Sequence, residues 1–158
     1  MARLPKLASQ WKIIHDFKAT EYLQTFQQPG SLCVRVEKPF RHGLVGLCFS
    51  FPKIVLAHSI LRENNQPEKG VFLQSNQLPE VGEWTRIEIS HEEVEGKYFL
   101  SLSVGGREVG REEVTDPQLR ELTDAKVTIG HNDRELSQPG YIRRLVVLEK
   151  QNDVLGEL

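Results

Sequence analysis

A run of acids, Glu92, Glu93 and Glu95, lies within the segment His-Glu-Glu-Val-Glu-Gly. Hydrolysis of a glycosidic bond requires two carboxylates about 5 to 10 Å apart. This run, however, falls in a polar break between two alternating segments, which predicts a solvated turn rather than a cleft. The sequence also contains no Glu-x-Asp motif and no His-Glu-x-x-His zinc motif. We therefore expect a protein without catalytic activity, and a glycan-cleaving enzyme is the disfavoured alternative.

The two cysteines, Cys33 and Cys48, each sit between apolar residues, in Leu-Cys-Val and Leu-Cys-Phe. If those apolar neighbours face a core, both thiols point to the opposite face of two consecutive strands. A disulfide between them requires Cα atoms within about 7 Å. The alternative is a pair of partly buried thiols, and the spacing does not suit a zinc site.

Alternation of apolar and polar residues with a period of two runs through most of the chain and predicts β-strands. The clearest segments are residues 11–17, 32–36, 44–51, 54–61, 70–75, 86–90, 98–104, 125–129 and 140–149. Turn sequences rich in Gly, Pro and Asn separate them, which predicts an all-β sandwich or barrel. We expect a single domain over residues 1–158, with its core at about 11–149.

Two segments are also compatible with helix. Residues 8–26 do not keep a strict alternation throughout, so part of this segment could be helical. In residues 116–124, Asp116 is a suitable N-cap and Pro117 a suitable first residue for one helical turn.

The bulk composition excludes several classes of function. The net charge is −2 and the pI about 6.2, so the sequence has no electrostatic footprint for nucleic acid or for an anionic membrane. No run of eighteen apolar residues predicts a transmembrane helix. The first eleven residues, Met-Ala-Arg-Leu-Pro-Lys-Leu-Ala-Ser-Gln-Trp, lack the apolar core of a signal peptide.

A family resemblance rests on three motifs between Gly82 and Glu149. They are Gly-Glu-Trp at 82–84 before a strand, Gly-Gly at 105–106 after the next one, and Gly-Tyr-Ile-Arg-Arg-Leu at 140–145 in the last strand. This segment resembles laminin-G-like and pentraxin-like domains, which are concanavalin-A-like jelly rolls. The resemblance implies a two-sheet antiparallel jelly-roll sandwich and a non-enzymatic recognition or adhesion module. It further implies an extracellular or secreted location and a protein or glycan partner; a cytoplasmic location stays open.

The same resemblance implies a calcium site at one rim of the sandwich. Asn132 and Asp133, in the loop after a predicted strand, offer the hard oxygen ligands that calcium prefers. Asp16 is a candidate for a further acidic ligand. The alternative is that Asn132 and Asp133 only form a turn.

A second, partial resemblance points to galectins, which are also jelly rolls. The segment His58-Ser-Ile-Leu-Arg62 has the His and Arg of the galectin motif, with Ile at the position of its Asn. Asn76, Trp84 and Glu88 follow in a similar order. The resemblance implies a galectin-like lectin as the alternative function, with Trp84 as the aromatic platform for a sugar. In the laminin-G-like interpretation, by contrast, the Trp at this position packs within the sandwich, and we expect Trp84 to be buried.

Overall fold

The structure is a computed structural model. It describes the backbone of residues 2–7, 10–23, 29–36, 42–61, 67–115, 122–129, 137–149 and 154–157. Side chains are described for residues 10–23, 29, 45–58, 70–115, 127–129 and 137–149. The regular secondary structure in these residues consists of β-strands. The described chain contains no helix able to span a membrane.

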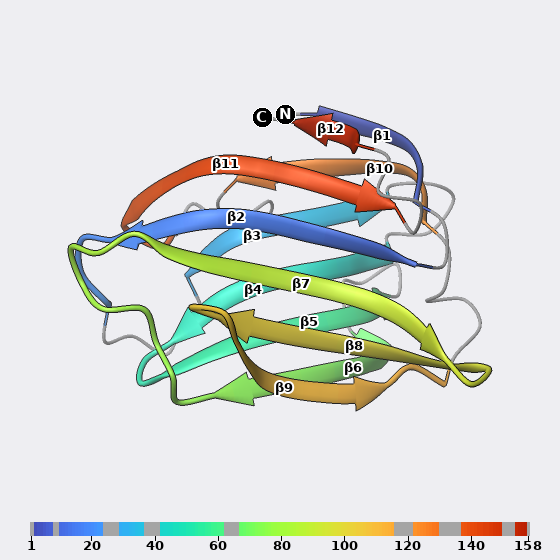
Figure 1. Ribbon diagram of the computed structural model, residues 1–158, viewed down its shortest axis with the longest axis horizontal. Coiled ribbons are helices and arrows are strands. Elements are labelled where there is room, and N and C mark those ends of the chain that lie inside the picture. Colours follow the sequence, from blue (N-terminus) through green and yellow to red (C-terminus); the bar gives the residue numbers. More distant parts are fainter. Residues whose placement is uncertain are drawn as a thin grey trace.

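The strands form two antiparallel six-stranded sheets packed face to face (Figure 1). Sheet A has the order β1 (Ala2–Leu7), β10 (Leu122–Ile129), β3 (Gly30–Val36), β4 (His42–Ser50), β5 (Lys53–Leu61) and β6 (Pro67–Ser75). Sheet B has the order β12 (Val154–Glu157), β11 (Gly140–Glu149), β2 (Trp11–Ala19), β7 (Thr85–Val94), β8 (Lys97–Val104) and β9 (Arg107–Glu113). The prediction of an all-β, two-sheet antiparallel sandwich is confirmed.

The core lies between the sheets and is built by alternate residues of each strand. On β2, Trp11, Ile13, His15 and Phe17 point inward and are almost completely buried. Phe17 stacks across the sandwich on Phe49 of β4, with ring centroids 5.1 Å apart. Since the side chains of a strand alternate between faces, the residues between them form the outer face of sheet B.

The expectation that part of residues 8–26 is helical is wrong for Trp11–Ala19, which form strand β2. This strand lies between β11 and β7 and hydrogen-bonds with both. Its period-two apolar pattern is satisfied by sheet A on one side, and this tertiary packing outweighs local propensity. The predicted cap residues Asp116 and Pro117 lie outside the described residues, while Leu122–Asp124 already belong to β10.

The predicted core boundaries, 11–149, leave out two strands. β1 and β12 lie at the edges of sheets A and B, beside each other, and bring the two chain ends together (Figure 1). Both sheets therefore extend by one strand beyond the segments whose alternation was visible in the sequence.

Candidate functional site

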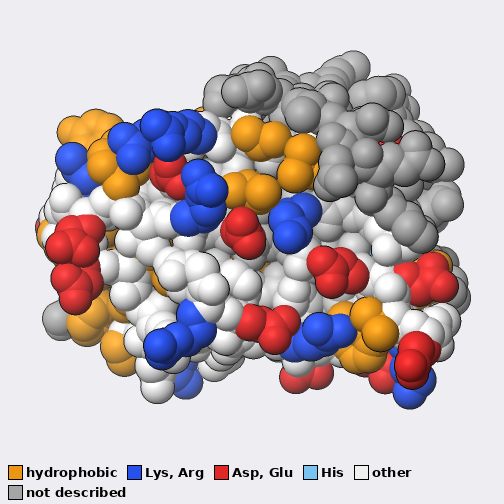
Figure 2. All heavy atoms as spheres, in the orientation of Figure 1, with side chains coloured by type: hydrophobic (Ala, Val, Ile, Leu, Met, Phe, Trp, Pro, Cys, Tyr) orange, Lys and Arg blue, Asp and Glu red, His pale blue; other side chains and the backbone are white. Residues whose placement is uncertain are grey.

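Basic and aromatic side chains gather on the outer face of sheet B, where β2 ends and β7 and β11 begin. Figure 2 shows blue basic side chains around orange hydrophobic ones at the upper left of this face. We call this group the basic–aromatic surface; it consists of Lys18, Trp84, Arg86, Tyr141, Arg143 and Arg144 around Asp16.

The first row of this surface crosses β11, β2 and the loop that leads into β7. Tyr141 of β11 lies opposite Lys18 of β2. Trp84 directly precedes Thr85, which pairs with Phe17 on the other side of β2. The register of the sheet therefore brings Tyr141, Lys18 and Trp84 side by side.

The second row is an ion-pair network around Asp16. Asp16 lies between Arg143 of β11 and Arg86 of β7 in the register of the sheet. The Nε of Arg86 donates to Oδ1 of Asp16 at 3.2 Å, and the Nε of Arg143 donates to Oδ2 at 3.3 Å. The Nη1 of Arg144 lies 3.7 Å from Oδ2. One carboxylate thus meets three guanidinium groups, and its side chain is only 8% exposed beneath them.

Burial by itself would raise the pKa of Asp16, but the hydrogen bonds and charges of Arg86 and Arg143 lower it below its ordinary value. Asp16 is therefore ionised at neutral pH. The excess positive charge of the surface stays on the arginines and on Lys18.

A β-bulge in β11 brings the third arginine to this side. The pairing of β11 with β2 shifts register between Arg143 and Val146, and Arg144 has a positive φ of 54°. Adjacent residues of a regular strand point to opposite faces, but this bulge directs both Arg143 and Arg144 toward Asp16. Positive φ is costly for a residue with a Cβ, so the pairing with Asp16 coincides with local backbone strain.

Trp84 is on the surface, and the prediction that it packs within the sandwich is wrong. It is 37% exposed, because no bulge reverses its position relative to the inward-pointing Ile87 and Ile89. The Arg143 guanidinium carbon lies 4.0 Å from the Trp84 ring centroid, a cation–π contact. Lys18 Nζ lies 5.5 Å from the same ring.

The loop that carries Trp84 is fixed to the end of β2. The amide of Gly82 donates to the carbonyl of Ala19 at 2.8 Å. Gly82 has a φ of 84°, which a glycine adopts readily. Tyr141 is 59% exposed, and Lys18 Nζ lies 5.8 Å from its ring centroid. Two accessible aromatic rings thus lie on either side of one lysine.

The residues of the galectin-like pattern are not brought together. His58 points into the core from β5 and is fully buried against Trp11 and His91, with ring centroids 6.3 and 5.8 Å away. Asn76 is exposed in the bend after β6, in the segment that leads to Trp84. Glu88 shares the outer face of β7 with Arg86. Arg62 lies outside the described residues.

The predicted calcium ligands Asn132 and Asp133 also lie outside the described residues, so that site stays a prediction. Asp16 does not suit the role of a further ligand, because three arginines already surround its carboxylate and would repel a cation. In the part of the chain that is described, no three His, Cys, Asp or Glu side chains form a group able to hold a metal ion.

The two cysteines lie on neighbouring strands but not directly opposite each other. Cys33 pairs with Gly46, and Cys48 pairs with Gly30. Such diagonal positions are roughly 7–8 Å apart, at the limit of disulfide geometry. Cys48 is half-buried, and its thiol lies 3.7 Å from the carbonyl oxygen of Val55; the side chain of Cys33 is not described. The disulfide stays a prediction.

The acidic run is not confined to a turn. Glu92 and Glu93 belong to β7, and only Glu95 lies in the turn that follows.

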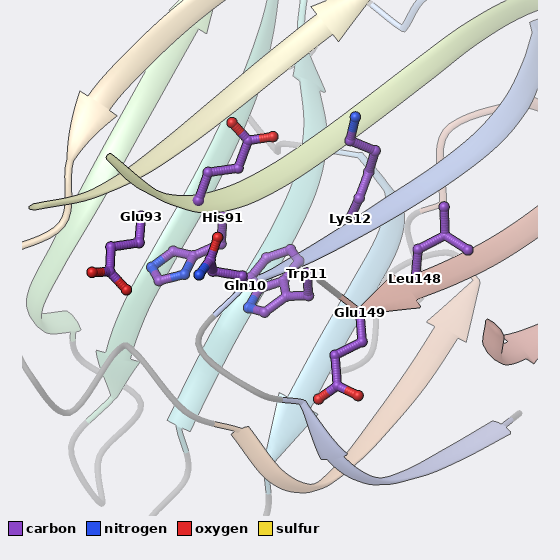
Figure 3. Close-up of a pocket in the computed structure, with 8 residues that line it drawn as sticks. Gln10, Trp11, Lys12, His91, Glu93, Leu148 and Glu149 are labelled. Carbon is purple, nitrogen blue, oxygen red and sulfur yellow. The ribbon is translucent and has the colours of Figure 1, made fainter. Parts of the chain in front are cut away.

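A pocket of about 250 Å³ lies at this end of sheet B. It is lined by Gln10, Trp11, Lys12, His91, Glu92, Glu93, Leu148 and Glu149. Figure 3 shows Gln10 beside the rings of Trp11 and His91, which are stacked with their centroids 5.5 Å apart.

The sequence indicated only part of the basic–aromatic surface. The alternation of β7 placed Trp84 and Arg86 on one parity, opposite to Ile87 and Ile89. Lys18, Tyr141 and Arg143 were missed, because their proximity depends on which strands are neighbours. Two local signals pointed to them. One was the set of polar residues that alternate with the apolar ones in β2, and the other was the Arg-Arg pair that interrupts the last alternating segment.

No family model and no curated protein sequence matches the chain. Solved structures match at low identity. An endo-β-1,4-glucuronan lyase from the fungus Trichoderma reesei has a TM-score of 0.66 and 10% identity, over 99% of this chain and 76% of that one. A native heptameric SAP-like pentraxin from Limulus polyphemus has a TM-score of 0.61 and 15% identity, over 94% and 67%.

The receptor-binding domain of botulinum neurotoxin type G has a TM-score of 0.59 and 10% identity over 90% of this chain, which spans only 38% of that domain. At such identities the likeness is one of fold. The chain has a two-sheet jelly-roll sandwich fold, as its sequence predicted.

Proposed function

We propose that the chain is a non-catalytic recognition module that binds a glycan through the basic–aromatic surface. The observation that carries this proposal is the row formed by Tyr141, Lys18 and Trp84, in which two exposed aromatic rings flank a cationic hydrogen-bond donor. Sugar rings bind to aromatic faces through their C–H groups, and neighbouring polar side chains then fix their hydroxyls.

The chemistry of the surface supports binding rather than catalysis. Its one acid in the two rows, Asp16, is covered by arginines and is ionised, so it cannot act as a general acid toward a bound sugar. The named functions of the structural neighbours include receptor binding as well as polysaccharide cleavage, and both are compatible with this fold. An extracellular location would suit a glycan-binding module and belongs to the same proposal.

A glycan array with matched variants tests the proposal. Trp84→Ala and Tyr141→Ala should each lose most of the array signal, because each removes one stacking platform. Phe72→Ala, which removes an exposed aromatic from β6 of the other sheet, should keep it. Trp84→Ala should cost less than about 1 kcal/mol of unfolding free energy, as expected for an exposed cation–π contact. Equal array signals for all three variants would exclude this surface as the glycan site.

A further inference from the structure

We propose that the sugar bound here carries an oxyanion, a carboxylate or a sulfate, and that Arg86 and Arg143 bind it. This inference rests on the proposed function, because it assigns the second row of the same surface to the charged substituent of a ring that stacks on the first row.

The first step concerns which N–H groups of the two arginines are already bound to Asp16. Asp16 accepts from the Nε of Arg86 and from the Nε of Arg143. Each guanidinium has five N–H donors, four of them on the terminal nitrogens. Those nitrogens make no other hydrogen bond within the described chain, and the side chains of Arg86 and Arg143 are 53% and 43% exposed. Their outer N–H groups therefore remain available to an anion from solvent.

Charge is the second step. One buried carboxylate meets three guanidinium groups, and Lys18 adds a further positive charge in the adjacent row. Glu88, the next acid along the outer face of β7, forms no ion pair with these arginines in the described residues. The surface therefore keeps an excess of positive charge, and an oxyanion would pair with it through charge-assisted hydrogen bonds.

Preorganisation is the third step. Arg143 is held at two points, by Asp16 on its Nε and by the Trp84 ring 4.0 Å away. A guanidinium fixed in this way loses little further freedom when it binds. Asp16 is thus a positioning residue: it is too deeply buried to contact a ligand, but it sets the direction of two arginine forks.

The spacing of the two rows is the fourth step. The Cα atoms of residues two apart on a strand are separated by roughly 6.7 Å, so Arg143 follows Tyr141 along β11 at about that spacing. This is about the reach from the centre of a six-membered sugar ring, through an acidic substituent, to its hydrogen-bond donor. A uronic acid or a sulfated sugar fits both rows at once, whereas a glutamate-rich peptide has no ring to place on Tyr141.

Calorimetric titration of the full chain tests this inference with three oligosaccharides of equal length. They are an oligomer of glucuronic acid, its carboxyl-reduced neutral counterpart, and the neutral oligomer carrying sulfate groups. We expect at least one acidic probe to bind about tenfold or more tightly than the neutral one. Binding of one acidic probe alone identifies carboxylate or sulfate as the source of the oxyanion.

Variants locate the effect. Arg86→Gln and Arg143→Lys should each weaken binding of the preferred acidic probe about tenfold and leave the neutral probe unchanged. Arg107→Gln, which removes an exposed arginine from the start of β9, is the charge-matched control and should bind as the wild type does. Asp16→Asn should weaken acidic binding although it removes a negative charge; tighter binding would refute its positioning role. Unfolding curves confirm that each variant is folded.

Four results would overturn the inference. They are equal affinity for acidic and neutral probes, no binding of either acidic probe, unchanged acidic binding in both arginine variants, and equal binding of a glutamate-rich peptide. Failure of the proposed function gives a different pattern, in which Trp84→Ala and Tyr141→Ala leave binding of every saccharide unchanged.

Discussion

His15 and Asp16 are neighbours in the chain, and both are almost completely buried. At neutral pH, however, His15 is neutral and Asp16 is ionised. His15 points into the core, where neither ring nitrogen has a hydrogen-bond partner among the described residues. Burial lowers its pKa to about 4, with Asp16 opposing the shift only in part. Asp16 points outward beneath three arginines, and its pKa is lowered because its charged form is the one that is paired.

The comparison extends to the two faces of β2. The inward face consists of large apolar or neutral groups that pack against sheet A, whereas the outward face holds charged groups that take part in the basic–aromatic surface. We therefore expect substitutions on the inward face to change stability and substitutions on the outward face to change binding.

Phe17 and Lys18 give the largest expected contrast. Phe17→Ala should lower the unfolding free energy by about 3–5 kcal/mol, because it leaves a cavity beside Phe49. Lys18→Ala should change it by no more than about 0.5 kcal/mol and should weaken glycan binding. Denaturant unfolding and titration of both variants measure the contrast. A similar stability loss in the two would show that the faces are not divided as described.

The pH dependence of stability sharpens the contrast between His15 and Asp16. An unfolded His15 takes up a proton near pH 6.5, whereas the folded one does so only near pH 4. Stability should therefore fall by about 3 kcal/mol as the pH drops from 6.5 to 4. The lowered pKa of Asp16 adds its own loss only below about pH 3.8.

Denaturant unfolding at pH 7 and pH 4.5 measures the contribution of His15. His15→Leu should remove most of the loss between these two values, because the leucine takes up no proton. An unchanged pH dependence in this variant would place the titrating group elsewhere in the chain.

Gly140 tests how closely β11 must approach β2 beneath Tyr141. A Cβ at this position would lie 2.5 Å from the carbonyl oxygen of Lys18 and 2.9 Å from the ring of Phe17. Gly140→Ala should cost about 1–3 kcal/mol and displace Tyr141. Gly46→Ala, where a Cβ would meet no described atom within 4 Å, is the matched control. Equal thermal stability of the two variants would contradict the close approach.

The sequence predicted the fold and the parity of its strands, because both follow from local alternation. The parity of β7 already separated Trp84 from Ile87 and Ile89, so the outward position of Trp84 was open to prediction. The laminin-G-like resemblance favoured the wrong side. Parity also placed His15 with Trp11 and Phe17, on the face that proved to be buried.

The pairing of the strands was not predictable, and the site depends on it. Asp16 meets Arg86 and Arg143 only because β2 lies between β7 and β11. The bulge that turns Arg144 toward Asp16 has no local signature beyond the Arg-Arg pair. The network around Asp16 depends on non-local register and on a strained backbone conformation, and local sequence patterns predict neither of them.

The central position of β2 also has a consequence for folding. Asp16 is separated from Arg86 by 70 residues and from Arg143 by 127. Contacts of this sequence separation form slowly, since the entropy of closing long loops is lost before the contacts form. During synthesis the carboxylate emerges early and its last partner late. The arginine pair can thus reach its binding geometry only after the ribosome has released β11, and a nascent chain that stops before this strand lacks that geometry.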